Sequence, residues 1–169
     1  MKMTNKNFRI AFSGKARSGK DSAAAALFQK YQFKTIKFAD PLYKLQYHIQ
    51  DLVEQQHHKD TKLLQFLGEG LRQNVDKDIW VINAKNTIKQ CEDNIVITDL
   101  RYKNEYDMLK KDFGFFICRI ERKNRPIDRD VNHISEVDLD DVEFDAVIHN
   151  DGTLDEFNKK IINMLEQNF

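Results

Sequence analysis

A glycine-rich stretch near the N-terminus has the residue types and the spacing that bind a polyphosphate. Residues 14–20 read GKARSGK and fit the pattern G-x-x-x-x-G-K. Two glycines let the backbone turn tightly, so that successive N–H groups point at phosphate oxygens, and Lys20 adds a positive charge beside the terminal phosphates. We therefore predict a nucleotide-binding loop made of Gly14, Lys15, Ala16, Arg17, Ser18, Gly19 and Lys20, followed by Asp21 and Ser22.

The residue after Lys20 departs from the usual pattern. Asp21 stands where a serine or threonine normally binds Mg²⁺ in such loops. Asp21 could hold the ion directly or through water, and the Ser22 hydroxyl is an alternative ligand. Asp21 could also be an ordinary acidic residue in the first turn of a helix. The sequence leaves these roles open, and we place Asp21 in a predicted metal site together with Asp99.

A second polar pair follows the apolar segment Asn94–Thr98. We predict that this segment is a buried strand, so that Asp99 would lie at its carboxyl end, where doubly wound sheets bind ligands. There Asp99 would face the phosphate loop and orient Mg²⁺ or its waters, or it would be an ordinary turn residue. Arg101, two residues later, has the planar guanidinium that grips a phosphate with two hydrogen bonds.

Short apolar segments alternate with helical patterns along the chain. We predict strands at Phe8–Ser13, Phe33–Phe38, Asn94–Thr98, Phe115–Ile120 and Ala146–His149. We predict helices at Asp21–Tyr31, from Pro41 into the mid-fifties, at Thr61–Arg72, Asp78–Gln90 and Lys103–Lys111, and after Thr153, which forms a capping box with Glu156. This order predicts an α/β P-loop NTPase fold, with a five-stranded, mostly parallel sheet and helices on both faces.

Length and composition limit the classes of protein that the chain can belong to. Its 169 residues suit one domain, and no linker rich in glycine, serine or proline divides them. Lys plus Arg total 27, as do Asp plus Glu, so there is no overall attraction to nucleic acid or anionic membrane. No apolar run reaches the ~20 residues that span a bilayer. We expect one soluble domain of residues 1–169 in a reducing compartment, without nucleic-acid or membrane partners.

Six short motifs occur in order along almost the whole chain. They are GKDS at 19–22, FADPL at 38–42, TDLRY at 98–102, HISE at 133–136, FDAVI at 144–148 and NDG at 150–152. In this order they resemble the phage-type deoxynucleoside monophosphate kinases. The resemblance implies a nucleoside monophosphate kinase-like fold with a lid. It also implies phosphoryl transfer from ATP, with Mg²⁺, to a deoxynucleoside 5′-monophosphate, by a monomer or homodimer in the cytoplasm of a bacterium or a phage-infected host.

The resemblance also implies where the acceptor nucleotide binds. It would dock after the second predicted strand, beside a helical region of about residues 39–90. The candidate residues are Phe38, Asp40, Lys44, Arg72 and Trp80, together with Arg101. Three of them have a second interpretation: Asp40 could cap the helix that begins near Pro41, Arg72 could be a favourable cation at a helix C-terminus, and Trp80 could be core. We favour capping for Asp40 and core for Trp80.

A basic segment between the fourth and fifth predicted strands contains Arg119, Arg122, Lys123, Arg125 and Arg129. Nucleotide kinases carry a lid there, so we predict a lid at about residues 121–135. Its candidates Arg122 and Arg125 would join Lys20, Arg101 and Asp99 in catalysis. The acidic residues at 136–145 are expected to form a solvated face that pairs loosely with the lid. The resemblance also implies that His133 and Glu136 are lid residues. Asn150, in the closing motif, is predicted to bind the nucleotide.

Three alternatives remain open. Animal-type phosphomevalonate kinases share the Gly-Lys-Asp variant, and dephospho-coenzyme A kinases share the general fold. A nucleotide-binding protein without transferase activity would also keep the phosphate loop. The pair Asp99 and Arg101 and the arginine-rich segment favour an enzyme.

Overall fold

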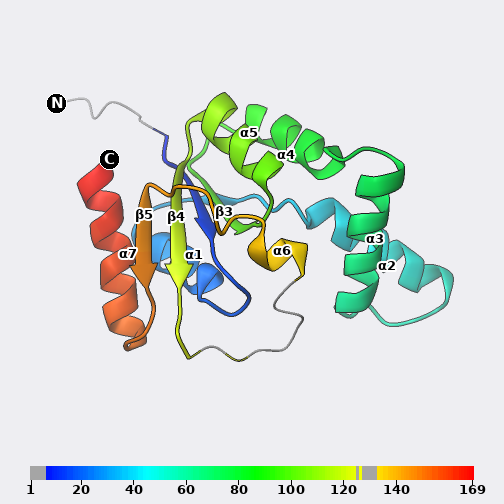
Figure 1. The fold of residues 1–169 in the computed structure, drawn as a ribbon, viewed down its shortest axis with the longest axis horizontal. Helices are drawn as coiled ribbons and strands as arrows, with labels where there is room; N and C mark the ends of the chain where they lie inside the picture. The colour runs from blue at the N-terminus through cyan, green and yellow to red at the C-terminus, as the bar shows by residue number, and fades with distance from the viewer. Residues whose placement is uncertain (1–6, 125, 127–132) are drawn as a thin grey trace. The chain divides into compact units, whose positions relative to one another are not determined.

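The computed structural model of the protein describes residues 7–124, 126 and 133–169, and strands alternate with helices along them (Figure 1). The strands are β1 (Arg9–Ser13), β2 (Lys34–Thr35), β3 (Ile95–Leu100), β4 (Phe116–Glu121) and β5 (Ala146–His149). The helices are α1 (Lys20–Lys30), α2 (Asp40–Leu52), α3 (Thr61–Asn74), α4 (Ile79–Lys89), α5 (Lys103–Phe113), α6 (Ile134–Val137) and α7 (Leu154–Asn168). Two compact units result: the helical segment Lys37–Gln90, and the rest of the chain, which contains the sheet.

The sheet has the strand order β2-β3-β1-β4-β5, and every neighbouring pair is parallel. β1 lies in the centre because β3 and β4 pair with its two edges. Its residues Ile10, Ala11 and Phe12 are completely buried, as expected for a parallel strand covered on both faces. The order of the strands brings the carboxyl ends of β1, β3 and β4 to one edge, which is where the phosphate loop begins.

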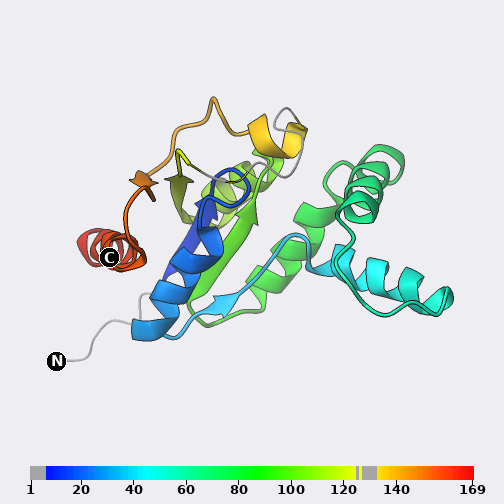
Figure 2. The ribbon, with the colours of Figure 1, turned by 90° about the horizontal axis from the view of Figure 1, so that it is seen from below.

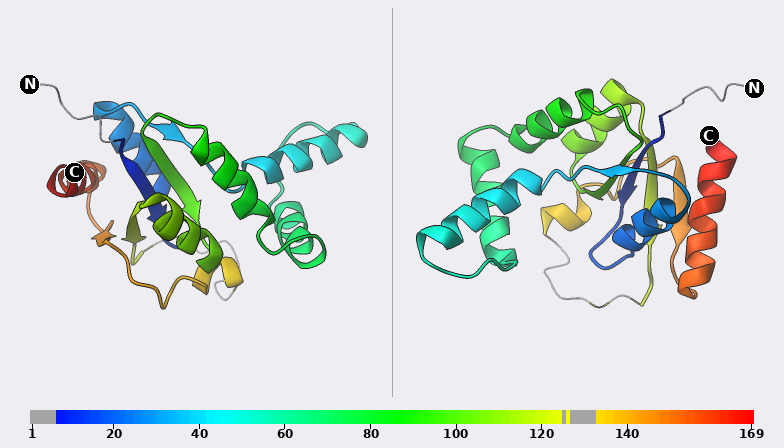
Figure 3. Two further views of the ribbon diagram at one scale, coloured as in Figure 1. Left: turned by 90° about the horizontal axis from the view of Figure 1, so that it is seen from above. Right: turned by 180° about the vertical axis from the view of Figure 1, so that it is seen from behind.

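Helices cover both faces of this sheet. α1 and α7 lie side by side on one face, and α5 lies on the opposite face (Figures 2 and 3). Ala23 and Leu27 of α1 pack with Phe157 and Ile161 of α7 and with Phe12 of β1 in one apolar cluster. The predicted α/β class, the five strands and the two covered faces are confirmed.

Three elements differ from the sequence prediction. β2 contains only Lys34 and Thr35, whereas the predicted strand covered Phe33–Phe38. Only these two residues pair with β3, where they lie opposite Ile95 and Val96. β3 continues to Leu100, which pairs with Ser13 after an irregularity in the register, so Asp99 lies inside a strand and not after it. The short helix α6 was not predicted, since it has only four residues.

Two buried glutamines fix the loop between α2 and α3, which is the longest loop of the helical unit. The Gln46 and Gln50 side chains donate hydrogen bonds to the His58 carbonyl oxygen, and the Asp60 N–H donates to Gln46 Oε1. In α4, the Trp80 side chain is only 4% exposed, and its indole N–H donates to the Gly68 carbonyl oxygen. Trp80 therefore has the packing role that we favoured. Within the described part of the chain, no helix has the length and apolar character needed to cross a membrane.

Candidate active site around the phosphate loop

The loop between β1 and α1 has a backbone that only glycine can adopt without strain at two positions. Gly14 has φ 143° and Gly19 has φ 110°, both in the left-handed region. A Cβ atom at Gly14 would lie 2.3 Å from the Ile120 carbonyl oxygen, and one at Gly19 would lie 2.4 Å from Asn150 Nδ2. The two glycines of the motif are therefore required by the conformation and by close packing.

Lys20 is folded over this loop. It is the first residue of α1 and is only 8% exposed. Its Nζ donates hydrogen bonds to the carbonyl oxygens of Gly14, at 2.7 Å, and Lys15, at 2.9 Å. The ammonium group thus lies inside the curve of the loop, at the positive N-terminal end of a helix. A phosphate bound there would meet both a fixed charge and a helix terminus.

Ser18 and Asn150 complete the inner side of the loop. Asn150 Nδ2 donates to the Ser18 carbonyl oxygen at 2.9 Å, which ties the segment after β5 to the loop. The Ser18 Oγ atom is buried and, among the described residues, has no hydrogen-bond partner. Buried polar atoms are nearly always paired, so this hydroxyl suits a ligand oxygen. The loop therefore fits a nucleotide phosphate.

Glu136, in α6, is the residue that the sequence analysis placed wrongly. We expected it in a solvated acidic face, but its side chain is only 1% exposed. Its Oε2 accepts a hydrogen bond from the Ala16 N–H of the phosphate loop at 2.8 Å, and its Oε1 lies 2.5 Å from Nη1 of Arg101. The HISE motif contained this residue, but its partners lie 120 and 35 positions away, and no local pattern indicates them.

Asp140, Asp141 and Asp145 of the acidic segment are exposed, as expected, and they pair with folded elements. The expected loose pairing with the lid stays a prediction, because most of the predicted lid lies outside the described residues. Asp140 lies 2.6 Å from Nη2 of Arg119 and 3.5 Å from the Lys15 Nζ. Asp141 pairs with Lys103, and Asp145 pairs with Lys110. Further acidic side chains of the segment therefore fix α5, β4 and the phosphate loop to one another.

Arg119 does not belong to a lid, although we counted it with the basic segment. It lies in β4, is buried, and its guanidinium stacks 5.4 Å above the ring of Phe144. Arg122 is exposed directly after β4. Arg125 lies outside the described residues, as do Arg129 and most of the predicted lid at 121–135. The roles of Arg122 and Arg125 stay predictions.

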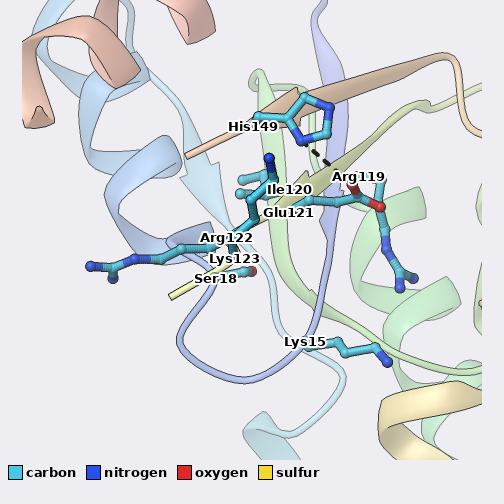
Figure 4. Close-up of a pocket in the computed structure, with 8 residues that line it drawn as sticks. All are labelled: Lys15, Ser18, Arg119, Ile120, Glu121, Arg122, Lys123 and His149. Atoms are coloured by element: carbon cyan, nitrogen blue, oxygen red, sulfur yellow. Dashed lines mark ion pairs between the residues drawn. The ribbon is translucent and has the colours of Figure 1, made fainter. Parts of the chain in front are cut away.

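A pocket of about 250 Å³ opens beside the phosphate loop (Figure 4). Ser18 and Lys15 line it from the loop, residues 119–123 from the end of β4, and His149 from β5. His149 Nδ1 lies 3.5 Å from Glu121 Oε2. Arg122 extends in a different direction from Arg119. Pockets that hold a whole small-molecule ligand measure about 300–1,000 Å³, so this smaller pocket suits one part of a nucleotide.

The two predicted metal ligands lie in the sheet-containing unit. Asp21 is exposed in the first turn of α1, and Asp99 is half-buried in β3. The described residues contain no group of three or more histidine, cysteine or acidic side chains arranged to hold a metal. Mg²⁺ in kinases takes only one or two carboxylates and completes its shell with water and phosphate oxygens. The metal roles of Asp21 and Asp99 stay predictions.

The remaining acceptor candidates lie in the helical unit. Phe38 is buried, Arg72 is half-buried in the last turn of α3, and Lys44 is exposed on α2. Asp40 is the first residue of α2 and not its N-cap, which is Ala39, so the capping role is wrong. Asp40 instead accepts a hydrogen bond from the Lys37 N–H. The binding roles of these four residues stay predictions.

Comparison with known proteins gives the family. The family model of the deoxynucleotide monophosphate kinases matches residues 45–161, more than half of the chain. A protein of Acanthamoeba polyphaga mimivirus, provisionally named a deoxynucleotide monophosphate kinase, is 28% identical over 93% of this chain and 95% of its own. A gluconokinase from Sinorhizobium meliloti 1021 shares the fold, with TM-score 0.50, 13% identity and 96% and 98% coverage of the two chains. The chain therefore belongs to the deoxynucleotide monophosphate kinase family.

Proposed function

We propose that the protein transfers the γ-phosphoryl group of ATP, bound with Mg²⁺, to the phosphate of a deoxynucleoside 5′-monophosphate. The observation that carries this proposal is the phosphate loop, with Lys20 folded over it and the Ser18 hydroxyl buried without a hydrogen-bond partner in the described part of the chain. The family supports the acceptor class and favours it over the two other kinase families considered above.

The reaction requires placement and charge more than covalent chemistry. An oxygen of the acceptor phosphate attacks the γ-phosphorus in line, and the bond from that phosphorus to the bridging oxygen breaks, releasing ADP. Lys20 and the loop N–H groups hold the donor phosphates, and Arg101 holds the acceptor phosphate. Asp21 and Asp99 would hold Mg²⁺, which would supply charge neutralisation at the phosphates. No general base is required, because the acceptor phosphate is already anionic near neutral pH.

The test is an ADP-release assay over all the common deoxy- and ribonucleoside monophosphates. Phosphomevalonate and dephospho-coenzyme A serve as the matched alternative acceptors, and ATP alone measures background hydrolysis. We expect rapid ADP release with at least one deoxynucleoside monophosphate. Turnover confined to one of the two alternative acceptors would contradict the proposed substrate class, and tight ATP binding without turnover on any acceptor would contradict the enzyme.

A further inference from the structure

Glu136 joins two groups that both bind anions. The Ala16 N–H belongs to the phosphate loop, and the Arg101 guanidinium follows the end of β3, yet both point at the carboxylate of Glu136. Arg101 Nη1 also donates to the Ser135 carbonyl oxygen at 3.2 Å, so α6 contacts it through two successive residues. One buried side chain therefore sets the distance between the loop and Arg101.

A buried carboxylate is costly unless it is paired and hydrogen-bonded. Arg101 provides the opposite charge and Ala16 provides a backbone donor, so both partners help to offset this cost. The same segment makes a second contact with the loop, because Asp140 lies between Lys15 Nζ and Arg119 Nη2. Two adjacent loop residues, Lys15 and Ala16, are thus held by one short acidic segment.

We propose that Glu136 is a positioning residue, which orients the phosphate loop and Arg101 together for phosphoryl transfer. The proposal rests on the proposed function in one respect, namely that Arg101 holds the acceptor phosphate. Glu136 itself contacts neither nucleotide in this account. It acts through Ala16 on the donor side and through Arg101 on the acceptor side.

The Glu136→Gln variant tests this account because it removes the charge and keeps the shape. A carboxylate has two acceptor oxygens, whereas an amide has one oxygen and an NH₂ group that only donates. The glutamine side chain therefore cannot accept from Ala16 through one atom and from Arg101 through the other. The matched control is Asp141→Asn, which removes one negative charge from the same segment. Asp141 pairs only with solvent-exposed Lys103 among the interactions described here, and it lies in neither nucleotide site.

Calorimetry would measure binding of the deoxynucleoside monophosphate preferred by the wild type and of a non-hydrolysable ATP analogue separately, and steady-state kinetics would give both KM values. For Glu136→Gln we expect about 10- to 100-fold weaker monophosphate binding, the effect of losing a charged hydrogen bond. We expect about 2- to 10-fold weaker binding of the ATP analogue, and no change beyond twofold for Asp141→Asn.

The double variant Arg101→Ala/Glu136→Gln separates positioning from general loss of structure. If Glu136 acts through Arg101, adding Glu136→Gln to Arg101→Ala does not raise the dissociation constant of the monophosphate any further. It still weakens binding of the ATP analogue. The proposal would be overturned if the two substitutions weakened monophosphate binding by factors that multiply in the double variant. It would also be overturned if Glu136→Gln bound the monophosphate and the ATP analogue as tightly as wild type. Should that variant not fold, Glu136→Asp keeps the charge but is too short for both partners, and the same pattern is expected.

Failure of the proposed function gives a different result. Wild-type protein that binds no deoxynucleoside monophosphate would refute the acceptor class. Binding of the ATP analogue by wild type and Glu136→Gln would still decide whether Glu136 orients the loop.

Discussion

Gly19 shows at the scale of one residue how tightly the nucleotide loop is built. Its φ of 110° and the 2.4 Å approach of Asn150 to a Cβ at this position leave no room for a side chain. We expect Gly19→Ala to strain the backbone by about 1–3 kcal/mol. Because the loop would shift, phosphoryl transfer should fall about 100-fold.

Gly70 provides the control for this substitution. It lies inside α3, and a Cβ there would meet no atom within 4 Å. Gly70→Ala should raise the free energy of unfolding by about 0.5–1 kcal/mol, since glycine is unfavourable inside a helix. Thermal unfolding and steady-state transfer rates would check both variants. Equal transfer rates for Gly19→Ala and wild type would show that phosphoryl transfer does not depend on the loop geometry described here.

Residue types alone predicted the phosphate loop but not the partners of its side chains. The motif from Gly14 to Lys20 consists of consecutive residues, so it can be recognised without knowledge of the fold. Glu136 is buried only because the tertiary fold brings it to Ala16 and Arg101. A run of acidic residues otherwise indicates a solvated surface, and that general rule produced the wrong prediction.

At the scale of elements, most apolar strands and the start of α7 were predicted well from local signals, whereas the helix cap expected at Asp40 was not found. Thr153 accepts a hydrogen bond from the Glu156 N–H, and the Glu156 carboxylate accepts from the Thr153 N–H, so the predicted capping box of α7 is confirmed. The lengths of β2 and β3 could not be predicted, because they depend on how far each neighbouring strand continues. The alternation of elements, by contrast, was sufficient for the parallel sheet.

The capping box gives a prediction for the stability of α7. Thr153→Ala removes the side-chain acceptor and should cost about 1 kcal/mol, or about 2–4 °C in Tm, while Thr153→Ser should retain the cap. Hydrogen bonds from Thr153, first from its backbone N–H, lower the pKa of the Glu156 carboxyl. The stabilisation by this carboxylate is therefore present at neutral pH and is lost as the pH falls through its lowered pKa.

Thermal melts of wild type and Glu156→Gln at several pH values would check the second part. The difference in Tm should be largest near pH 7 and should disappear once the pH has fallen below the lowered pKa of Glu156. A difference that grows on acidification would have the wrong sign for a lowered pKa.

At the scale of the whole molecule, equal numbers of basic and acidic residues give zero net charge. Several of these residues form direct ion pairs beside the phosphate loop. Lys15, Arg101 and Arg119 surround or support the phosphate loop, and Asp140 and Glu136 hold them. The structure shows acids in direct contact with these cations, so the loop region is organised by its own ion pairs.

Cys118, in the middle of β4, reports on global unfolding. Burial, with a smaller contribution from the charge of Asp145, raises the pKa of its thiol to about 12. The unfolded thiol ionises near pH 9, so from there upward the unfolded state binds fewer protons than the folded state. Folding stability should then fall by about 1.4 kcal/mol per pH unit from this residue alone.

The measurement is the pH dependence of the free energy of unfolding above pH 9, in wild type and in Cys118→Ala. The substitution should remove this contribution to the slope. Alkylation of Cys118 by iodoacetamide in the native protein should also require unfolding, and rapid labelling at pH 8 would contradict the described burial.

The central claim is that Lys20, held over the phosphate loop, binds the phosphates of the donor during transfer. Phosphoryl transfer to the preferred deoxynucleoside monophosphate should be compared in wild type, Lys20→Ala and Lys30→Ala, which removes an exposed lysine from the other end of α1. We predict that Lys20→Ala lowers the rate about 100- to 1,000-fold while the protein stays folded by circular dichroism, and that Lys30→Ala keeps the wild-type rate. Full activity in a folded Lys20→Ala variant would contradict the account.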